Sequence, residues 1–227
     1  MSELHDFFVN FLYFVAFFQK NNKEYLIRFY FFLTNGKNCC IITLEVTEML
    51  SNYHFKLEYL TKPLEYNSIL LYQIGRLYCT ETTLIDTHFH LNWFELTIVT
   101  DGSGTVTTNG VASPIRRGDI YLSFPYESHK IETNPDEPLK YDFFAFHSNR
   151  EHVRSELSRI VENYCSPDKR LFQDSRIRTL IGNAIAEFGA EQAGKEEVLN
   201  AIFQQTLIYL IRNFQTATQG KEYDTVT

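Results

Sequence analysis

The chain has 227 residues, of which 44% are hydrophobic and 22% are charged, a composition typical of globular proteins and unlike that of disordered or fibrous ones. Its 28 acidic and 21 basic residues give a formal net charge of −7, which repels phosphates and excludes a basic nucleic-acid-binding surface. The four cysteines form no CxxC pair, and the longest apolar run, 7–18, is shorter than the roughly 20 residues of a membrane span. These features predict a cytoplasmic protein without a membrane segment.

Residues 1–48 differ from the rest of the chain. They hold nine of the 20 phenylalanines and lack clean helical or strand periodicity. The codons of residues 44–46 can form a ribosome-binding sequence at a suitable distance before the codon of Met49. We therefore interpret 1–48 as a spurious or poorly structured extension and Met49 as the true start. The alternative is a genuine N-terminal helix.

Residues 49–148 are predicted to be β structure. Apolar and polar side chains alternate at period two over short stretches, as they do in half-buried strands. Asn109-Gly110 is a strong hairpin signal, because both residues tolerate positive φ. Eight or so short strands without intervening helices indicate a sandwich or barrel. The strands that we expect cover residues 53–60, 68–79, 83–90, 93–100, 104–108, 120–124 and 140–147.

The apolar spacing becomes helical after residue 148. We expect helices over 151–165, from the Asp174-Ser175 cap to about residue 188, and over 196–214. The last of these carries a broad apolar stripe at three- and four-residue steps. Such a stripe suits either a dimer interface or packing against the barrel. The polar tail, 215–227, is interpreted as the start of a linker.

The chemistry is concentrated between His88 and His129. His88 and His90 lie two residues apart on a predicted strand, so both imidazoles share a face. A turn after His90 would bring Glu95 inward from the next strand, and His129 supplies a third imidazole. Three neutral nitrogens and one carboxylate suit a divalent ion such as Zn, Ni, Fe or Mn. A lone HxH pair is more often structural than metal-binding, whereas the ordered set is more specific. The other histidines, among them His147, are isolated and are expected not to be ligands.

The ordered set resembles the two motifs of the cupin superfamily. The first motif is matched by His88, His90, Glu95 and Gly102, and the second by Gly118, Pro125 and His129. The match departs from the family pattern at three places. Thr82 replaces an expected glycine, the glycine between Pro125 and His129 is missing, and Thr133 stands where an asparagine is common. More closely, segments 87–110, 114–132 and 141–147 resemble the effector-binding domain of AraC/XylS-type transcription regulators.

This resemblance implies a mainly β fold with α structure at its C-terminal end: a cupin barrel (a double-stranded β-helix, or jelly roll) followed by two or three helices. The barrel would occupy 49–148, and 149–227 would form the dimerisation helices and the start of a linker. In such regulators a C-terminal helix-turn-helix part binds DNA. Because this sequence ends at Thr227, where that part is expected, we interpret it as a fragment of a longer regulator; a free-standing sensor is the alternative.

Two functions follow from these features. In the first, a small molecule such as a sugar binds to His88, His90, Glu95 and His129 and stacks on Trp93. The homodimer, formed through the helices around 196–214, would then control transcription through the DNA-binding part. In the second, the chain is a metal-dependent cupin enzyme, an oxygenase or isomerase. The helical last third favours the sensor. Whether the cluster holds an ion or only lines a polar pocket stays open.

Overall fold

A computed structural model of the chain describes residues 10–20, 23–34, 37–39, 46–54 and 58–223. The chain divides into two compact units, Met1–Leu50 and Ser51–Thr227. In the first unit, β1 and β2 form an antiparallel hairpin, and both β3 and the first residues of β4 pair with β2. The backbone thus forms strands here, not the helix of the alternative. These strands are β1 (Asn10–Lys20), β2 (Lys23–Thr34), β3 (Lys37–Cys39) and β4 (Val46–His54).

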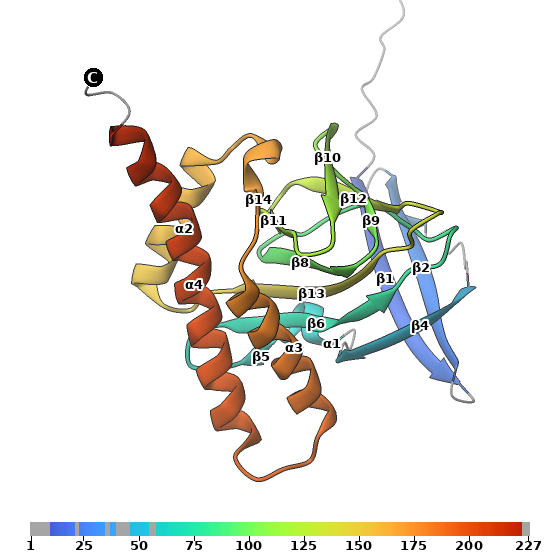
Figure 1. Cartoon of the computed structure of the whole chain (residues 1–227). Coiled ribbons are helices and arrows are strands. Elements are labelled where there is room, and N and C mark those ends of the chain that lie inside the picture. Colours follow the sequence, from blue (N-terminus) through green and yellow to red (C-terminus); the bar gives the residue numbers. More distant parts are fainter. Residues whose placement is uncertain (1–9, 21–22, 35–36, 40–45, 55–57, 224–227) are drawn as a thin grey trace, which may run out of the picture. The chain divides into compact units, whose positions relative to one another are not determined.

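The second unit contains two antiparallel sheets within its described residues (Figure 1). The larger sheet has the order β6, β13, β8, β11, β14, with β5 beside β6. Its strands are β5 (Leu64–Glu65), β6 (Leu70–Tyr78), β8 (Phe94–Asp101), β11 (Ile120–Ser123), β13 (Lys140–His147) and β14 (Leu171–Phe172). The smaller sheet has the order β10, β9, β12, β7. Its strands are β7 (Leu84–Phe89), β9 (Ser103–Thr108), β10 (Val111–Arg116) and β12 (Ser128–Thr133).

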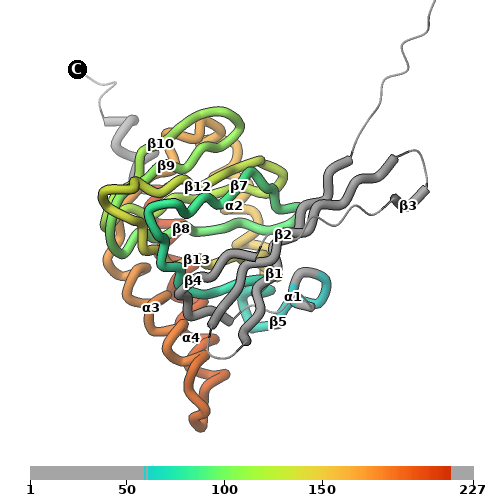
Figure 2. The backbone as a smooth tube through the Cα atoms, turned by 90° about the vertical axis from the view of Figure 1, so that its right-hand side faces the viewer, coloured from blue at the N-terminus to red at the C-terminus, as the bar shows by residue number. Residues whose placement is uncertain are grey.

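Three helices follow the barrel, as the sequence predicts. Figure 2 shows α3 and α4 on one side of the larger sheet and the smaller sheet on its other side. The helical elements are α1 (Glu58–Thr61), α2 (Glu151–Asn163), the 3-10 turn η1 (Pro167–Arg170), α3 (Ser175–Gly189) and α4 (Lys195–Tyr223). No helix in the described part of the chain is both long and apolar enough to cross a membrane.

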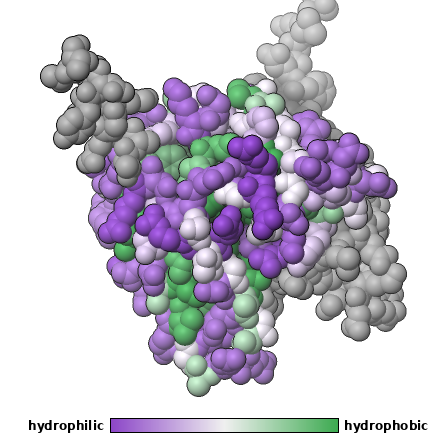
Figure 3. Space-filling model, in the orientation of Figure 1, coloured by the Kyte–Doolittle hydropathy of each residue, from purple (hydrophilic) through white to green (hydrophobic). Residues whose placement is uncertain are grey.

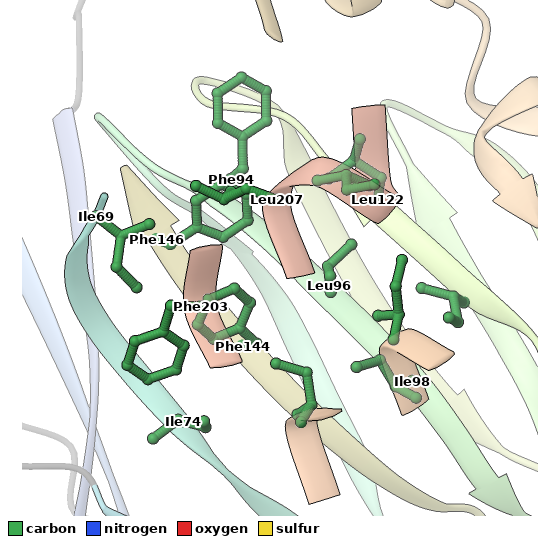
Figure 4. Packing of buried hydrophobic residues seen from close by; sticks show 14 of the residues in the cluster. Ile69, Ile74, Phe94, Leu96, Ile98, Leu122, Phe144, Phe146, Phe203 and Leu207 are labelled. Carbon is green, nitrogen blue, oxygen red and sulfur yellow. The ribbon is translucent and has the colours of Figure 1, made fainter. Parts of the chain in front are cut away.

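The larger sheet has two different faces because side chains alternate along each strand. On β8, the alternate residues Phe94, Leu96 and Ile98 belong to the apolar core that the sheet shares with the helices. Figure 4 shows Leu96 and Phe203 in this core, which joins sheet to helix. Glu95 lies between Phe94 and Leu96 and therefore points toward the barrel interior. Both faces of β8 are buried.

The apolar stripe of α4 packs against the barrel, so the packing alternative is confirmed. All seven stripe residues belong to the shared core and have exposed fractions of 9% or less. They are Leu199, Ile202, Phe203, Leu207, Leu210, Ile211 and Phe214. Among the α4 side chains whose burial is described, the exposed large hydrophobic residues are instead Val198 and Ile208. Figure 3 shows an apolar patch over α3 and α4, surrounded by hydrophilic residues.

Three sequence-based expectations about elements need correction. The strand predicted over 53–60 is wrong at its end, because residues 58–61 form one helical turn that reverses the chain before β5. The expected strand list also lacked β10 and β12, which complete the smaller sheet. The last helix, predicted over 196–214, is longer, since α4 continues to Tyr223. That the polar tail begins a linker stays a prediction.

Two turns have the backbone that the sequence predicts. Asn109 and Gly110 both have positive φ, at 48° and 82°, as a type I′ hairpin turn between β9 and β10 requires. Gly102 has φ +72°, and a Cβ at this position would lie 2.2 Å from the carbonyl oxygen of Pro138. The glycine that ends the first motif is therefore required by both the turn and the close approach of the backbone.

Candidate metal centre

The four candidate ligands come from both sheets. His88 lies on β7, His90 directly follows that strand, His129 lies on β12 and Glu95 lies on β8. His129 is the register partner of His88, which places both imidazoles on one face of the smaller sheet. The turn after His90 leads to the larger sheet, so Glu95 meets the histidines from the opposite wall. The structure thus brings together all four residues, with one ligand atom of each within 4.8 Å of the others.

The cluster is tightly packed and mostly buried. The ring centroids of His88 and His129 are 4.3 Å apart, and that of His90 is 5.0 Å from each. His90 Nε2 lies 3.2 Å from Glu95 Oε2, and His129 Nε2 lies 3.7 Å from Glu95 Oε1. His90, Glu95 and His129 are buried, while His88 is half-buried.

Burial and neighbouring charges set the protonation of the cluster. Burial lowers the pKa of His88 well below its ordinary value, and the adjacent imidazoles lower it further. Burial also lowers the pKa of His90. For Glu95, burial alone would raise the pKa, but the imidazoles of His90 and His129 outweigh it and hold the pKa well below the ordinary range. Near pH 7 the cluster therefore offers neutral imidazoles at 88 and 90 beside an ionised carboxylate.

One hydrogen bond fixes the tautomer of His88. Its Nδ1–H donates to the carbonyl oxygen of Asp86 over 2.8 Å, because a carbonyl can only accept. In the neutral ring, Nε2 then carries the lone pair. A backbone carbonyl that orients an imidazole in this way is typical of metal-binding histidines.

The donor set fits a divalent ion. His90 Nε2 and both ring nitrogens of His129 are buried and have no hydrogen-bond partner among the described residues. Two ligands on opposite sides of an ion, each at about 2.1 Å, would be about 4.2 Å apart, so the 4.8 Å spread needs only a small closure. Three nitrogens and one oxygen suit Zn, Ni, Fe or Mn.

Trp93 lies beside the cluster as part of its wall. Its indole stacks on the ring of Tyr72 at 4.3 Å with an interplanar angle of 19°, and it lies 4.9 Å from the ring of His90. The side chain is buried, and no described residue accepts a hydrogen bond from its Nε1. At least one face of the indole is thus covered by protein. Its predicted role as a stacking surface for a ligand stays a prediction.

Further polar groups share the inner face with Glu95. Thr97 lies two residues along β8, and Ser123 is the register partner of Glu95 on β11. Both hydroxyls are buried and lack a hydrogen-bond partner within the described chain. Deeper in the same face, the Tyr121 hydroxyl donates to Thr108 Oγ1 over 2.8 Å. The barrel interior is therefore polar around the cluster, with unused hydrogen-bonding capacity.

A buried arginine, which the sequence analysis did not single out, contacts the segment that carries His129. Arg170 is fully buried and donates to both carboxylate oxygens of Glu127, two residues before His129. It also donates to the carbonyl oxygens of Tyr164 and Cys165, and its guanidinium lies 3.8 Å from the centre of the Phe124 ring. The segment Asp168-Lys169-Arg170 has the composition of an exposed turn, so its sequence gave no sign of this contact.

The chain matches one protein family over most of the second unit. The family described as AraC-like ligand binding domain matches residues 71–209. No curated protein matches the chain.

Solved structures that match the chain include two proteins with low sequence identity to it. One is a predicted oxalate decarboxylase from Thermotoga maritima, with 23% identity, a TM-score of 0.33, and coverage of 45% of this chain and 80% of that one. Another is a cupin protein from Bacteroides fragilis, with 14% identity, a TM-score of 0.35, and coverage of 48% and 85%. Because the matched family covers more than half of the sequence, including both sheets and the three helices, the chain belongs to the AraC-like ligand binding domain family, with a cupin barrel followed by helices.

Proposed function

We propose that this chain is the effector-sensing part of an AraC-type transcription regulator. Its barrel would bind a small polar molecule, such as a sugar, at His88, His90, Glu95 and His129. The observation that supports this most strongly is the set of buried polar atoms without partners around Glu95. An unsatisfied buried polar group costs about 1–3 kcal/mol, so a molecule that supplies partners is bound favourably.

The same four residues would hold a divalent ion in the metal-bound form of this sensor. When bound, the ion would carry positive charge and would offer a free coordination position to an oxygen of the effector. His88, oriented by the carbonyl of Asp86, would contribute Nε2, and Glu95 would contribute the negative charge. The hydroxyls of Thr97 and Ser123 would then bind other oxygens of the same molecule.

Binding would reach the helices through the larger sheet. Glu95 faces the pocket, whereas its neighbours Phe94 and Leu96 pack in the core shared with the helices. A shift of β8 toward a bound effector would therefore move side chains of the apolar core to which α3 and α4 also contribute. The contact of Arg170 with Glu127 provides a second connection, from the His129 segment to the end of α2. An effector that fits one arrangement better would shift the population toward it.

The regulator would act as a cytoplasmic homodimer and contact DNA through a domain outside this sequence. The net charge of −7 agrees with DNA binding by another segment. Because the apolar stripe of 199–214 is used within the chain, a dimer interface on α4 would involve its exposed side, where Val198 and Ile208 lie. The proposed dimer would thus still use the helix around 196–214, but not the apolar stripe itself.

The alternative function is a metal-dependent cupin enzyme, an oxygenase or isomerase. The observation in its favour is the same cluster, in which three imidazoles and one carboxylate lie within 4.8 Å and resemble a catalytic ligand set. In an enzyme, this set would leave an open coordination position for substrate. The two functions differ in one measurable way, because a sensor binds its ligand without converting it.

The experiment combines metal analysis with ligand-dependent thermal unfolding. The protein is purified without a nickel column, and its metal content is measured for wild type, His88→Ala and the control His152→Ala, an exposed histidine on α2. All three proteins are then heated with a panel of sugars and with divalent ions. A ligand at 100 times its Kd stabilises the fold by about 2.7 kcal/mol.

We expect a sugar or ion to raise the Tm of wild type and His152→Ala but not that of His88→Ala. Unchanged sugar recovered after incubation supports the sensor, and conversion of the sugar supports the enzyme. Equal Tm shifts in all three proteins would refute binding at the cluster.

A further inference from the structure

A separate cavity lies where the barrel meets α2. Its volume is about 690 Å³, within the range of sites for small organic ligands. It is lined by Tyr72 and Phe94 of the larger sheet, by Pro125 and Tyr126 of the segment before β12, and by one face of α2. None of the four cluster residues is among its lining residues. The cavity is thus distinct from the candidate metal centre.

The wall formed by α2 has a regular pattern. The lining residues of this helix recur at three- and four-residue steps, which places them on one face. They are Arg154, Leu157, Ser158, Val161 and Glu162. Arg154 and Glu162 are eight residues apart, or roughly 12 Å along the helix axis. Leu157 and Val161 lie between them and, with the rings of Tyr72 and Phe94, form an apolar middle.

Polar groups gather at the Arg154 end. His147 lies close enough to Arg154 for the arginine charge to act on it, and the Tyr126 hydroxyl donates to Asn92 Oδ1 over 2.7 Å. Burial lowers the pKa of His147, so this imidazole is neutral near pH 7. Arg154 is then the lining residue that carries a positive charge. Its ion-pair partner Glu151 is 91% exposed, so this surface pair is weak and leaves Arg154 able to bind another anion. This end of the cavity favours an anionic group.

Tyr126 has an unusual conformation at this cavity. Its φ is +66°, in the left-handed region that non-glycine residues rarely adopt, and its side chain is 71% exposed. The backbone is held there by the Tyr126 N–H, which donates to the carbonyl oxygen of His90 over 2.7 Å. A strained residue that is fixed beside a cavity is typical of a ligand-binding site.

The cavity and the metal cluster share a wall. Tyr72 lines the cavity and stacks on Trp93, whose indole lies 4.9 Å from the His90 ring. On another side of the cavity, the backbone N–H of Tyr126 donates a hydrogen bond to the backbone carbonyl oxygen of His90. A ligand in the cavity would therefore contact residues that pack against the cluster without touching the cluster itself.

We propose that this cavity binds a small aromatic carboxylate, with its ring between Tyr72, Phe94 and the apolar face of α2 and its carboxylate at Arg154. A flat ring matches the aromatic walls and the apolar middle. The carboxylate matches the guanidinium and the polar groups beside it. Glu162 at the far end disfavours a second negative group, so the ligand is a monoanion. This site does not depend on the proposed binding at the metal cluster.

The test uses 1-naphthoate as the probe and follows its fluorescence during titration of the full chain. Two matched pairs of variants on α2 separate the cavity from the rest of the helix. Arg154→Gln removes the lining cation, while Arg159→Gln removes an arginine that is 68% exposed and outside the cavity. Ser158→Trp fills the cavity, while Ser155→Trp places the same side chain at an exposed position that does not line it.

We expect wild type, Arg159→Gln, Ser155→Trp and His88→Ala to bind 1-naphthoate with Kd values within about twofold of one another. Arg154→Gln should weaken binding about 10-fold or more, in line with a charge-assisted contact. Ser158→Trp should abolish it. The neutral probe 1-naphthalenemethanol should bind wild type more weakly and should not distinguish Arg154→Gln from Arg159→Gln.

Three results would overturn the proposal. The first is no binding of 1-naphthoate to wild type at millimolar concentration, and the second is equal binding by both members of either pair. The third is loss of binding in His88→Ala but not in Ser158→Trp, which would place the probe at the metal cluster and leave the proposed sensor function intact. Because Arg154 and Arg159 are exposed, circular dichroism of these two variants should match that of wild type.

Discussion

The two faces of the larger sheet differ in how completely their side chains are satisfied. The face toward the helices is apolar and closely packed, with Leu96, Phe144 and Phe203 each fully buried. The face toward the barrel interior carries Glu95, Thr97 and Ser123, of which the two hydroxyls lack partners in the described chain. The comparison indicates that the helix-facing side contributes most of the stability, whereas the interior leaves polar groups unsatisfied, as the proposed binding of a small molecule would require.

The largest expected effect is on the helix-facing side. Phe203 stacks on Phe144 at 5.4 Å and contacts Tyr66 edge-on at 4.9 Å. Phe203→Ala should lower the free energy of unfolding by about 3–5 kcal/mol, because it removes a buried ring and leaves a cavity. Urea denaturation followed by circular dichroism measures this. Phe203→Leu is the control and should lose much less, because it leaves a smaller cavity. Equal losses in both variants would contradict the explanation by cavity volume.

The next largest effect concerns the buried ion pair between Arg170 of η1 and Glu127 of the segment before His129. Arg170→Gln leaves Glu127 beside Phe124 without its cation and leaves two carbonyl oxygens without a donor. We expect a loss of about 3 kcal/mol, since removal of one partner leaves a poorly solvated charge. Lys169→Gln, at the exposed neighbouring position, should change the unfolding free energy by less than about 0.5 kcal/mol. Similar losses in both variants would show that the turn, and not the pair, is responsible.

A smaller, pH-dependent effect is expected within the helical region. The Asp174 carboxylate accepts a bond from the Arg176 N–H and pairs with the Arg176 side chain and with Asn213 of α4. Hydrogen bonding to Arg176, reinforced by Asn213, lowers the Asp174 pKa from 3.8 to about 2. Because the folded-state pKa is the lower one, this stabilisation is complete above about pH 5 and is lost as the pH falls through 4 toward 2.

Asp174→Ala should therefore cost about 1 kcal/mol at pH 7, the usual value of a helix cap. The difference from wild type should shrink in denaturation experiments at pH 3. Asp174→Asn keeps a capping oxygen and should lose less. A difference that stays constant from pH 7 to pH 2.5 would contradict the role of the carboxylate charge.

The smallest effect is expected in the barrel interior. Thr97→Val replaces a hydroxyl without a partner by a methyl group of similar size, so it should leave stability unchanged or raise it by less than about 1 kcal/mol. Thr100→Val on the same strand is the matched control, because the Thr100 hydroxyl donates to the carbonyl oxygen of Lys140 over 2.8 Å. This variant should lose about 1 kcal/mol. A clear loss in Thr97→Val would mean that the interior is as satisfied as the helix-facing core.

Much of the barrel was predictable because its strands alternate cleanly. The strand over 140–147 agrees with the prediction residue for residue, and the Asn109-Gly110 turn has the expected backbone. The convergence of His88, His90 and Glu95 followed from one period-two rule and one turn. Strands of two residues, such as β5 and β14, are too short to show any period, so sequence patterns could not reveal them.

Other features depend on contacts between distant segments and could not be predicted. Arg170 pairs with Glu127, 43 residues away, and local composition contains nothing about that partner. The cavity beside α2 joins Tyr72 to Val161, so neither residue suggests it alone. His147 was interpreted as an isolated histidine and lies outside the metal cluster, but it lines this cavity.

Both faces of β8 are buried, and this restricts how the length of the strand can vary among related sequences. Deleting Phe94 would shift the register of β8 by one residue and exchange its two faces, placing the Glu95 carboxylate among the phenylalanines and Leu96 against the imidazoles. Insertions and deletions should therefore be absent from this strand in functional relatives. They should collect instead in exposed connections, such as residues 191–194 between α3 and α4.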